Sequence, residues 1–343
     1  LMRASSVLSF VKSTARAVGM GKLYRLGIRK PVNTVKQSIR EGGPLEQWRT
    51  RRGKEEMIEA AEQLPKTKPP PSPSEPMKVH FLTGADHWYQ SLFCFLSLQR
   101  FCEERVTPVL YSDGSLSEVY REKFRRVVPW VEIQTLGDIE ARLNKALPES
   151  EYPLLREWRH IQPLTRKITD LHAGAEGWKL LLDSDMLFFR KPQFLLDYLR
   201  QPERPCFMVD IDTAYGYSPQ LRYRLADGPI PEAANIGIFG LKSESIDFDR
   251  IQRWLRVLLE EENTHYNITQ GLSSLIFSGR DCAVAASDEY VVFPSLEEGK
   301  SPTVTLHHYV AESKRAYFQY GWRHVHQSIV EEDVFATDTE PVQ

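Results

Sequence analysis

A short apolar run that ends in two carboxylates constrains this chain more than any other feature. Residues 180–182 are continuous and apolar, as expected for a strand that is buried on both faces of a parallel sheet. Asp183 and Asp185 follow directly, and the apolar pattern resumes over 186–189. Because open α/β sheets bind ligands at the carboxyl ends of their strands, we expect the two acids at a ligand-binding edge. Paired acids there favour Mg²⁺ or Mn²⁺, held together with the phosphates of a substrate.

The sequence after residue 77 alternates between β-favouring and helical segments. Strands that alternate with helices favour a parallel sheet. We therefore predict an α/β fold, with a mostly parallel central sheet and flanking helices in a single catalytic domain. The predicted strands, besides 180–182, are 78–82, 107–111, 131–135, 206–211, 234–241, 290–294 and 303–309, and the main predicted helices are 88–101, 117–127, 158–172 and 248–261.

The amino-terminal part differs in charge from the rest. Between Leu1 and Arg52 there are twelve Lys or Arg residues and two acids. A basic amphipathic segment of this kind binds anionic membrane surfaces, and an arm packed on its own domain or on a partner is the simpler alternative. We predict a basic helical extension at 1–64, a proline-rich extended linker at 65–76, the catalytic domain at 77–330 and an acidic flexible tail at 331–343.

Composition limits the classes of function. The 343 residues carry a formal net charge of −2 at pH 7, which argues against a nucleic-acid binder that works through overall charge. No apolar run approaches the roughly 18 residues that a membrane-spanning helix needs. The four cysteines form no Cys-x-x-Cys pair, so we expect no structural zinc site, and a reducing compartment fits. We predict a cytoplasmic protein. Peripheral contact with the inner membrane face follows only under the first of the two interpretations of its basic extension.

Two segments resemble those of a known enzyme family. Residues 179–192 (KLLLDSDMLFFRKP) resemble the Asp-x-Asp segment of nucleotide-sugar glycosyltransferases of the GT-A fold, in particular glycosyltransferase family 8. The resemblance implies that Asp183 contacts the ribose and the metal and that Asp185 ligates the metal. Residues 234–241 (ANIGIFGL) resemble the Asn-x-Gly strand of these enzymes, which implies that Asn235, beside Gly237, contacts the donor sugar.

The same resemblance, which spans about 77–325, implies a nucleoside site after the first predicted strand. A strand, a turn of small residues and a helix present backbone N–H groups to a ligand. By the resemblance, Thr83, Gly84 and Ala85 cradle the nucleoside, and Tyr89 stacks on the base. Lys167, on the helix before the paired acids, reaches the sugar or the phosphates.

The carboxyl-terminal part supplies the remaining candidates. By the resemblance, Gln270 lies on the helix that closes the donor pocket, although Thr269 stands where many family members have an acid. His308 completes the metal shell, and Lys314, six residues later, neutralises the leaving diphosphate. Adjacent residues of a strand face opposite sides, so only one of His307 and His308 is expected to face the metal, and we favour His308.

The resemblance implies metal-dependent transfer of a sugar from a nucleoside diphosphate sugar, a UDP-sugar, to a hydroxyl of a saccharide, lipid or protein acceptor, with retention of configuration. Inversion would instead need a base such as Asp210 or Asp212, a second Asp-x-Asp that also rivals the first for the metal. Two further alternatives stay open. One is an inactive nucleotide- or carbohydrate-binding scaffold, and the other is a sugar-1-phosphate nucleotidyltransferase, which the turn at 83–86, without arginine, disfavours.

Overall fold

The computed structural model of the chain describes residues 42–72 and 76–331. Its contacts divide the chain into two units, Leu1–Lys54 and Glu55–Gln343. The first unit includes the start of helix α4 (Pro44–Gln63), where Arg49 pairs with Glu46. Most of the predicted basic extension and nearly all of the acidic tail lie outside the described residues. Within the described part of the chain, no helix combines the length and the apolar character that a membrane span requires.

The predicted proline-rich linker follows α4. Its described stretch at 65–72 contains neither helix nor strand. The N–H and the hydroxyl of Thr67 both donate to Val127 O, at 2.8 and 2.6 Å, and Arg105 N–H donates to Pro71 O at 2.8 Å. This stretch belongs to the second unit and lies against the parts of that unit that contain Arg105 and Val127. The exact start of the predicted catalytic domain stays a prediction.

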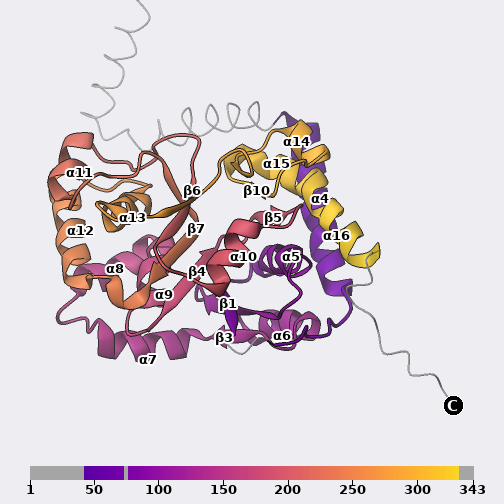
Figure 1. Cartoon of the computed structure of the whole chain (residues 1–343), viewed down its shortest axis with the longest axis horizontal. Helices are drawn as coiled ribbons and strands as arrows, with labels where there is room; N and C mark the ends of the chain where they lie inside the picture. Colours follow the sequence, from indigo (N-terminus) through magenta and orange to yellow (C-terminus); the bar gives the residue numbers. More distant parts are fainter. Residues whose placement is uncertain (1–41, 73–75, 332–343) are drawn as a thin grey trace, which may run out of the picture. The chain divides into compact units, whose positions relative to one another are not determined.

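A seven-stranded sheet forms the centre of the second unit. Its strands are β1 (Met77–Thr83), β2 (Val106–Ser112), β3 (Glu132–Gln134), β4 (Trp178–Leu182), β6 (Cys206–Val209), β7 (Ala234–Lys242) and β8 (Ala283–Ala285). They lie in the order β3-β2-β1-β4-β7-β6-β8, and Figure 1 labels β3, β1, β4, β7 and β6 along it. β7 runs antiparallel to its neighbours β4 and β6, and the other pairs are parallel. The predicted α/β fold with a mostly parallel sheet and flanking helices is therefore confirmed.

A smaller sheet and a first set of helices cover one face of the central sheet. Leu180 and Leu182 of β4 belong to this core. The small sheet has the order β5-β10-β9 and consists of β5 (Met186–Phe188), β9 (Tyr290–Val292) and β10 (Leu306–His308). The helices of this part are α5 (Trp88–Gln99), α6 (Glu118–Val127), α10 (Gln193–Arg200), α14 (Leu296–Lys300), α15 (Lys314–Ala316), the π-helical turn Tyr317–Gly321 and α16 (Trp322–Glu331).

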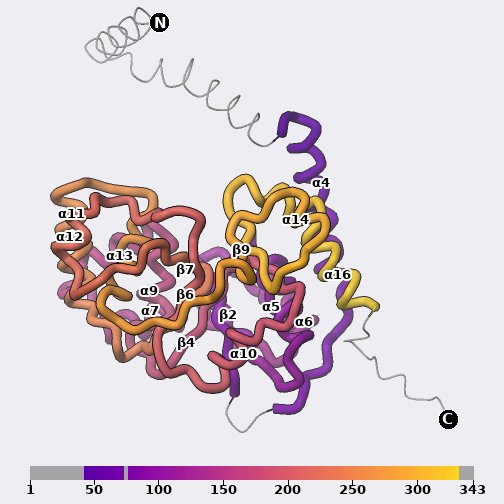
Figure 2. Tube along the Cα trace, turned by 45° about the horizontal axis from the view of Figure 1, so that its top comes forward, coloured from indigo at the N-terminus to yellow at the C-terminus, as the bar shows by residue number. Residues whose placement is uncertain are grey.

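A second set of helices covers the opposite face. Leu181 packs into this core, so β4 is buried on both faces, as its continuous apolar pattern predicts. Figure 2 shows this set and the group around α5 and α16 on either side of β4, β6 and β7. The second set consists of α7 (Leu136–Ala146), α8 (Pro153–Ile161), α9 (Arg166–His172), α11 (Pro219–Leu225), α12 (Phe248–Glu262) and α13 (Ile268–Phe277).

The prediction of one helix over 158–172 is wrong. The segment is divided into α8, a 3₁₀ turn at Pro163–Thr165 and α9. Proline lacks a backbone N–H and its ring disfavours a helical conformation at the preceding residue, so Pro163 interrupts the helical backbone. The break lets α9 begin at Arg166, directly before Lys167.

The direction of β7 determines which residues meet at the end of β4. Because β7 is antiparallel to β4, its amino end lies beside the carboxyl end of β4. Leu182 pairs with Ile238, and Asp183 N–H donates to Gly237 O at 2.9 Å. The chain then enters β5, which pairs with β10 and sets His308 opposite Met186. Segments far apart in the sequence therefore converge on the paired acids.

Candidate functional site

Asp183, Asp185 and His308 meet beyond the carboxyl end of β4. One potential ligand atom from each lies within 4.8 Å of the others, and they form the one group of this kind among residues 42–72 and 76–331. His308 Nε2 lies 3.6 Å from Asp183 Oδ2 and 3.3 Å from Asp185 Oδ1. Two ligands at right angles around an octahedral ion with bonds of about 2.1 Å are roughly 3 Å apart. The spacing of the three atoms therefore suits a small divalent cation.

The surroundings of His308 support this interpretation. The imidazole is 2% exposed, and among residues 42–72 and 76–331 neither ring nitrogen has a partner that meets hydrogen-bond geometry, the two nearby carboxylates included. A buried polar atom without a partner costs about 1–3 kcal/mol, so His308 is placed for a ligand rather than for a protein group. The neighbouring His307 faces away, with its Nδ1 3.0 Å from the Tyr309 hydroxyl and its ring against Phe189. Burial lowers the pKa of His307 to about 4, so this second histidine is neutral at pH 7.

Two lysines pair with the outer oxygens of the acids. Lys167 Nζ lies 2.5 Å from Asp183 Oδ1, and Lys314 Nζ lies 2.6 Å from Asp185 Oδ2. The other oxygen of each acid is the one nearest His308. Burial opposes the ionisation of Asp185, but the Lys314 ammonium and His308 outweigh it and hold the pKa of this carboxyl well below its ordinary value. One oxygen of each carboxylate thus pairs with a lysine, and the other oxygen faces His308.

Gly237 allows the close approach of β10 to β7. A Cβ atom at this position would lie 2.4 Å from His308 Cε1 and 2.5 Å from Met186 Cε. Real Cβ atoms do not come so near, since carbon atoms pack at about 3.5–4.0 Å. Gly237 of the predicted Asn-x-Gly strand therefore leaves the space that the His308 imidazole occupies.

Asp210, which directly follows β6, joins the two predicted amide side chains. Asn235 Nδ2 and Gln270 Nε2 both donate to Asp210 Oδ2, each at 2.9 Å, and Asp210 Oδ1 accepts from Ile211 N–H at 2.9 Å. Asn235 Oδ1 accepts in turn from Gly237 N–H at 2.8 Å. The second Asp-x-Asp is thus outside the acid–histidine group of the described residues, and its first acid organises a polar network instead. Sequence reasoning missed this partnership with Gln270 because the two residues lie on separate elements.

The turn after β1 packs against the loop after β2. The carboxylate of Asp113 occupies the space that a Cβ at Gly84 would take, at 2.1 Å from Oδ1. Ala85 N–H donates to Ser115 Oγ at 2.9 Å, and Ser115 Oγ donates to Asp113 Oδ1 at 2.7 Å. Asp113 was not among the predicted site residues, although its place at a strand end is the same signal as for Asp183. The nucleoside role of this turn stays a prediction.

Two more predicted residues of this region are buried. Thr83 is 1% exposed, and its hydroxyl accepts from Ser91 Oγ at 2.8 Å. Tyr89 is also 1% exposed, with its ring edge-on to that of Trp88. Stacking of a base on Tyr89 would therefore require its ring to move.

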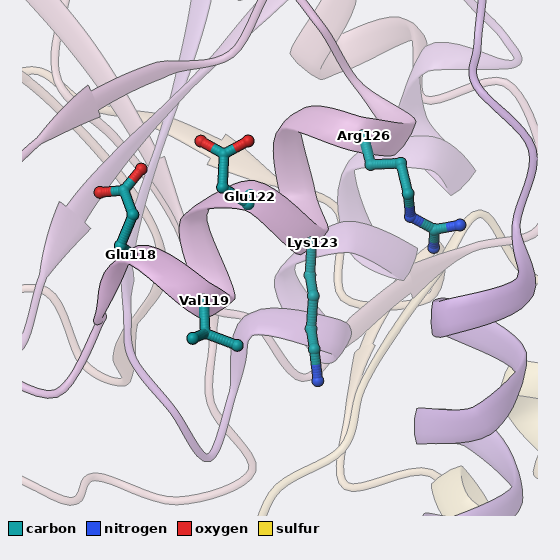
Figure 3. A pocket seen from close by; sticks show the side chains of 5 residues that line it. All are labelled: Glu118, Val119, Glu122, Lys123 and Arg126. Carbon is teal, nitrogen blue, oxygen red and sulfur yellow. The ribbon is translucent and has the colours of Figure 1, made fainter.

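A surface hollow of about 610 Å³ lies along α6 and shares no lining residue with the candidate site. Figure 3 shows its acidic side chains, Glu118 and Glu122, on one side of the helix and Lys123 on the other. Lys123 Nζ already pairs with Glu62 at 2.5 Å, and Arg126 donates to the Ala61 carbonyl at 3.3 Å. These basic groups therefore bind the carboxyl-terminal end of α4.

The sequence matches no protein-family model and no curated protein. Solved structures with a similar fold include the galactosyltransferase LgtC with donor and acceptor sugar analogues (14% identity, 78% of this chain and 98% of that chain, TM-score 0.48). Others are mouse xyloside xylosyltransferase 1 (12%, 69% and 98%, 0.46) and the bifunctional glycosyltransferase WbbM (14%, 78% and 52%, 0.47). At these identities and TM-scores, the function has to be inferred from the site residues themselves.

Proposed function

We propose that this chain is a metal-dependent glycosyltransferase that moves a sugar from a UDP-sugar to a hydroxyl of a saccharide, lipid or protein acceptor. The observation that carries the proposal is the convergence of Asp183, Asp185 and His308, with Lys167 and Lys314 on the outer oxygens of the acids. The two carboxylates and the two ammonium groups cancel in charge. A bound divalent ion leaves the site with two positive charges, and a diphosphate complements that surplus.

Asp183, Asp185 and His308 would hold Mn²⁺ or Mg²⁺, since carboxylate oxygens with one imidazole suit these ions. When bound, the ion stabilises negative charge on the diphosphate as a Lewis acid. Lys314 is half-buried beside Asp185, where its ammonium can stabilise the charge that develops on the leaving diphosphate. Lys167 is 3% exposed and also donates to Ile236 O at 3.2 Å, which directs its charge between the acids and β7.

The amide network next to the acids would orient the donor sugar. Asn235 and Gln270 are both anchored on Asp210, so the three side chains form one unit. Because both Asp210 oxygens already accept hydrogen bonds, we assign this acid to positioning rather than to proton abstraction. We therefore propose transfer with retention, in which no dedicated base is needed.

Isothermal titration of UDP, with and without Mn²⁺, tests the donor site. We expect binding that needs Mn²⁺ and is lost in Asp185→Ala and His308→Ala. His307→Gln is the matched control, because His307 is adjacent in sequence but faces away from the acids. If neither UDP nor GDP binds in the presence of Mn²⁺, the proposal fails.

Turnover separates the enzyme from a binding scaffold. We expect release of UDP from at least one member of a panel of UDP-sugars in the presence of Mn²⁺, and no release by Asp185→Ala. Metal-dependent binding of UDP without release from any sugar of the panel would favour the scaffold.

A further inference from the structure

Ser184, the residue between the two acids, contacts a buried hydroxyl on α5. Ser184 Oγ lies 2.8 Å from Ser91 Oγ, and Ser91 is fully buried. Ser91 Oγ also lies 2.8 Å from Thr83 Oγ1 and 3.2 Å from the carbonyl oxygen of His87. A chain of three hydroxyls thus connects the end of β1, the helix α5 and the turn that carries the acids.

The contact between Ser91 and Ser184 lies in a row of small side chains along α5. Ser91, Cys94 and Ser97 are fully buried and follow one another at intervals of three residues, so they lie near one face of α5. Ser97 Oγ accepts from Phe188 N–H at 3.1 Å, and the thiol of Cys94 contacts the backbone of Met186. Small side chains at these positions bring α5 close to the segment that runs from the acids into β5.

The turn itself is held from three directions. Asp183 N–H donates to Gly237 O of β7 at 2.9 Å, and the carbonyl of Asp185 accepts from Tyr309 N–H after β10 at 2.9 Å. The hydroxyl contact from Ser91 holds the residue between them. These anchors set the directions in which the two carboxylates leave the turn.

We propose that Ser91 is a positioning residue, whose hydroxyl acts through Ser184 to fix the spacing of the Asp183 and Asp185 carboxylates around the metal ion. This inference rests on the proposed metal site. Ser91 touches neither acid, so its effect passes through the turn. Groups that orient metal ligands typically change metal affinity by about 10–100-fold when they are removed. Because Ser91 acts one residue away from each ligand, we expect a value near the lower end.

The test measures Mn²⁺ affinity of the full chain from the electron paramagnetic resonance signal of free Mn²⁺, without any need for turnover. Ser91→Ala and Ser184→Ala are each expected to weaken binding about tenfold. The double variant should bind Mn²⁺ no more weakly than the weaker-binding of the two single variants, because each single substitution already removes the contact between Ser91 and Ser184. Ser97→Ala is the matched control. It lies on the same helix and is equally buried, but it contacts Phe188 beyond the acids, so we expect wild-type Mn²⁺ affinity.

Wild-type affinity in folded Ser91→Ala or Ser184→Ala, or effects that add in the double variant, would overturn the inference and leave the metal site intact. An equal loss in Ser97→Ala would also overturn it, because the effect would then belong to helix packing. If wild-type protein and Asp185→Ala bind Mn²⁺ equally weakly, the proposed metal site itself fails. Circular dichroism and thermal melting verify that each variant is folded.

Discussion

Replacement of Gly237 by alanine is the sharpest single test of how the fold builds the metal site. The added methyl group would lie 2.4 Å from His308 Cε1, 2.7 Å from His308 Nδ1 and 2.5 Å from Met186 Cε. Carbon atoms pack at about 3.5–4.0 Å, so the imidazole has to move by about 1 Å. His308 Nε2 is 3.3 and 3.6 Å from the two carboxylate oxygens, and a displacement of that size removes it from the common coordination shell.

Two effects follow from this displacement. Overpacking of a filled core typically costs about 1–3 kcal/mol of folding free energy, so we expect Gly237→Ala to be destabilised but folded. Removal of a group that only orients a ligand typically weakens metal binding about 10–100-fold, so displacement of the ligand itself should weaken Mn²⁺ binding by at least about tenfold.

Gly240→Ala separates the two effects. Gly240 lies on the same strand, β7, and its added methyl group would lie 2.4 Å from Cys206 Sγ and 2.5 Å from the Tyr198 hydroxyl, neither of which belongs to the site. We expect a comparable loss in urea unfolding and wild-type Mn²⁺ affinity. The reasoning is refuted if folded Gly237→Ala binds Mn²⁺ like the wild type, or if Gly240→Ala weakens binding as much.

Three further outcomes are expected. Lys314→Ala should weaken UDP binding in Mn²⁺ by about 10–100-fold in titration calorimetry, because a hydrogen bond to a charged group contributes about 1.5–3 kcal/mol; unchanged affinity would contradict its role. Arg159→Met should lower the free energy of unfolding in urea by about 3–5 kcal/mol, because it leaves the fully buried Asp170 carboxylate without the guanidinium that contacts it at 2.7 and 2.8 Å. A loss below about 1 kcal/mol would argue against this. Burial lowers the pKa of His172 to about 3, whereas a histidine in the unfolded chain has a pKa of about 6.5. Between these two pH values the unfolded chain therefore binds one proton more than the folded protein. Stability should therefore fall as the pH falls below about 6.5, and less steeply in His172→Gln; equal slopes would exclude this cause.

Local patterns identified the parts of the site that lie on one stretch of chain. The apolar run at 180–182 predicted a strand buried on both faces, and β4 is such a strand. Asp183 and Asp185 follow it, so their place at the edge of the sheet could be inferred from chain order alone. Alternation along a strand predicted that His307 and His308 face opposite sides, and the structure places the His308 ring beside the acids and the His307 ring beside Tyr309. The role of His308 as a metal ligand stays a proposal.

Local patterns failed where a distant partner or a break decided the outcome. Helical spacing over 158–172 concealed the interruption at Pro163. Gln270 and Asn235 were predicted separately, yet both donate a hydrogen bond to Asp210. The sequence indicated Asp210 as a rival metal ligand or as a base, and not as their common partner. The role of Asp113 beside Gly84 was not predicted, because contact between two loops leaves no periodic trace in the sequence.

The sequence by itself thus determined the α/β class and the strand that the two acids follow, because these depend on the order and spacing of residues along the chain. Only the tertiary structure decided which residues from separate segments meet at the site, such as Asn235 and Gln270 on one oxygen of Asp210. The antiparallel direction of β7 brings Gly237 beside Asp183, and the pairing of β5 with β10 brings His308 beside Asp185. Strand order and direction arise from packing across the whole sheet, and no local spacing specifies them.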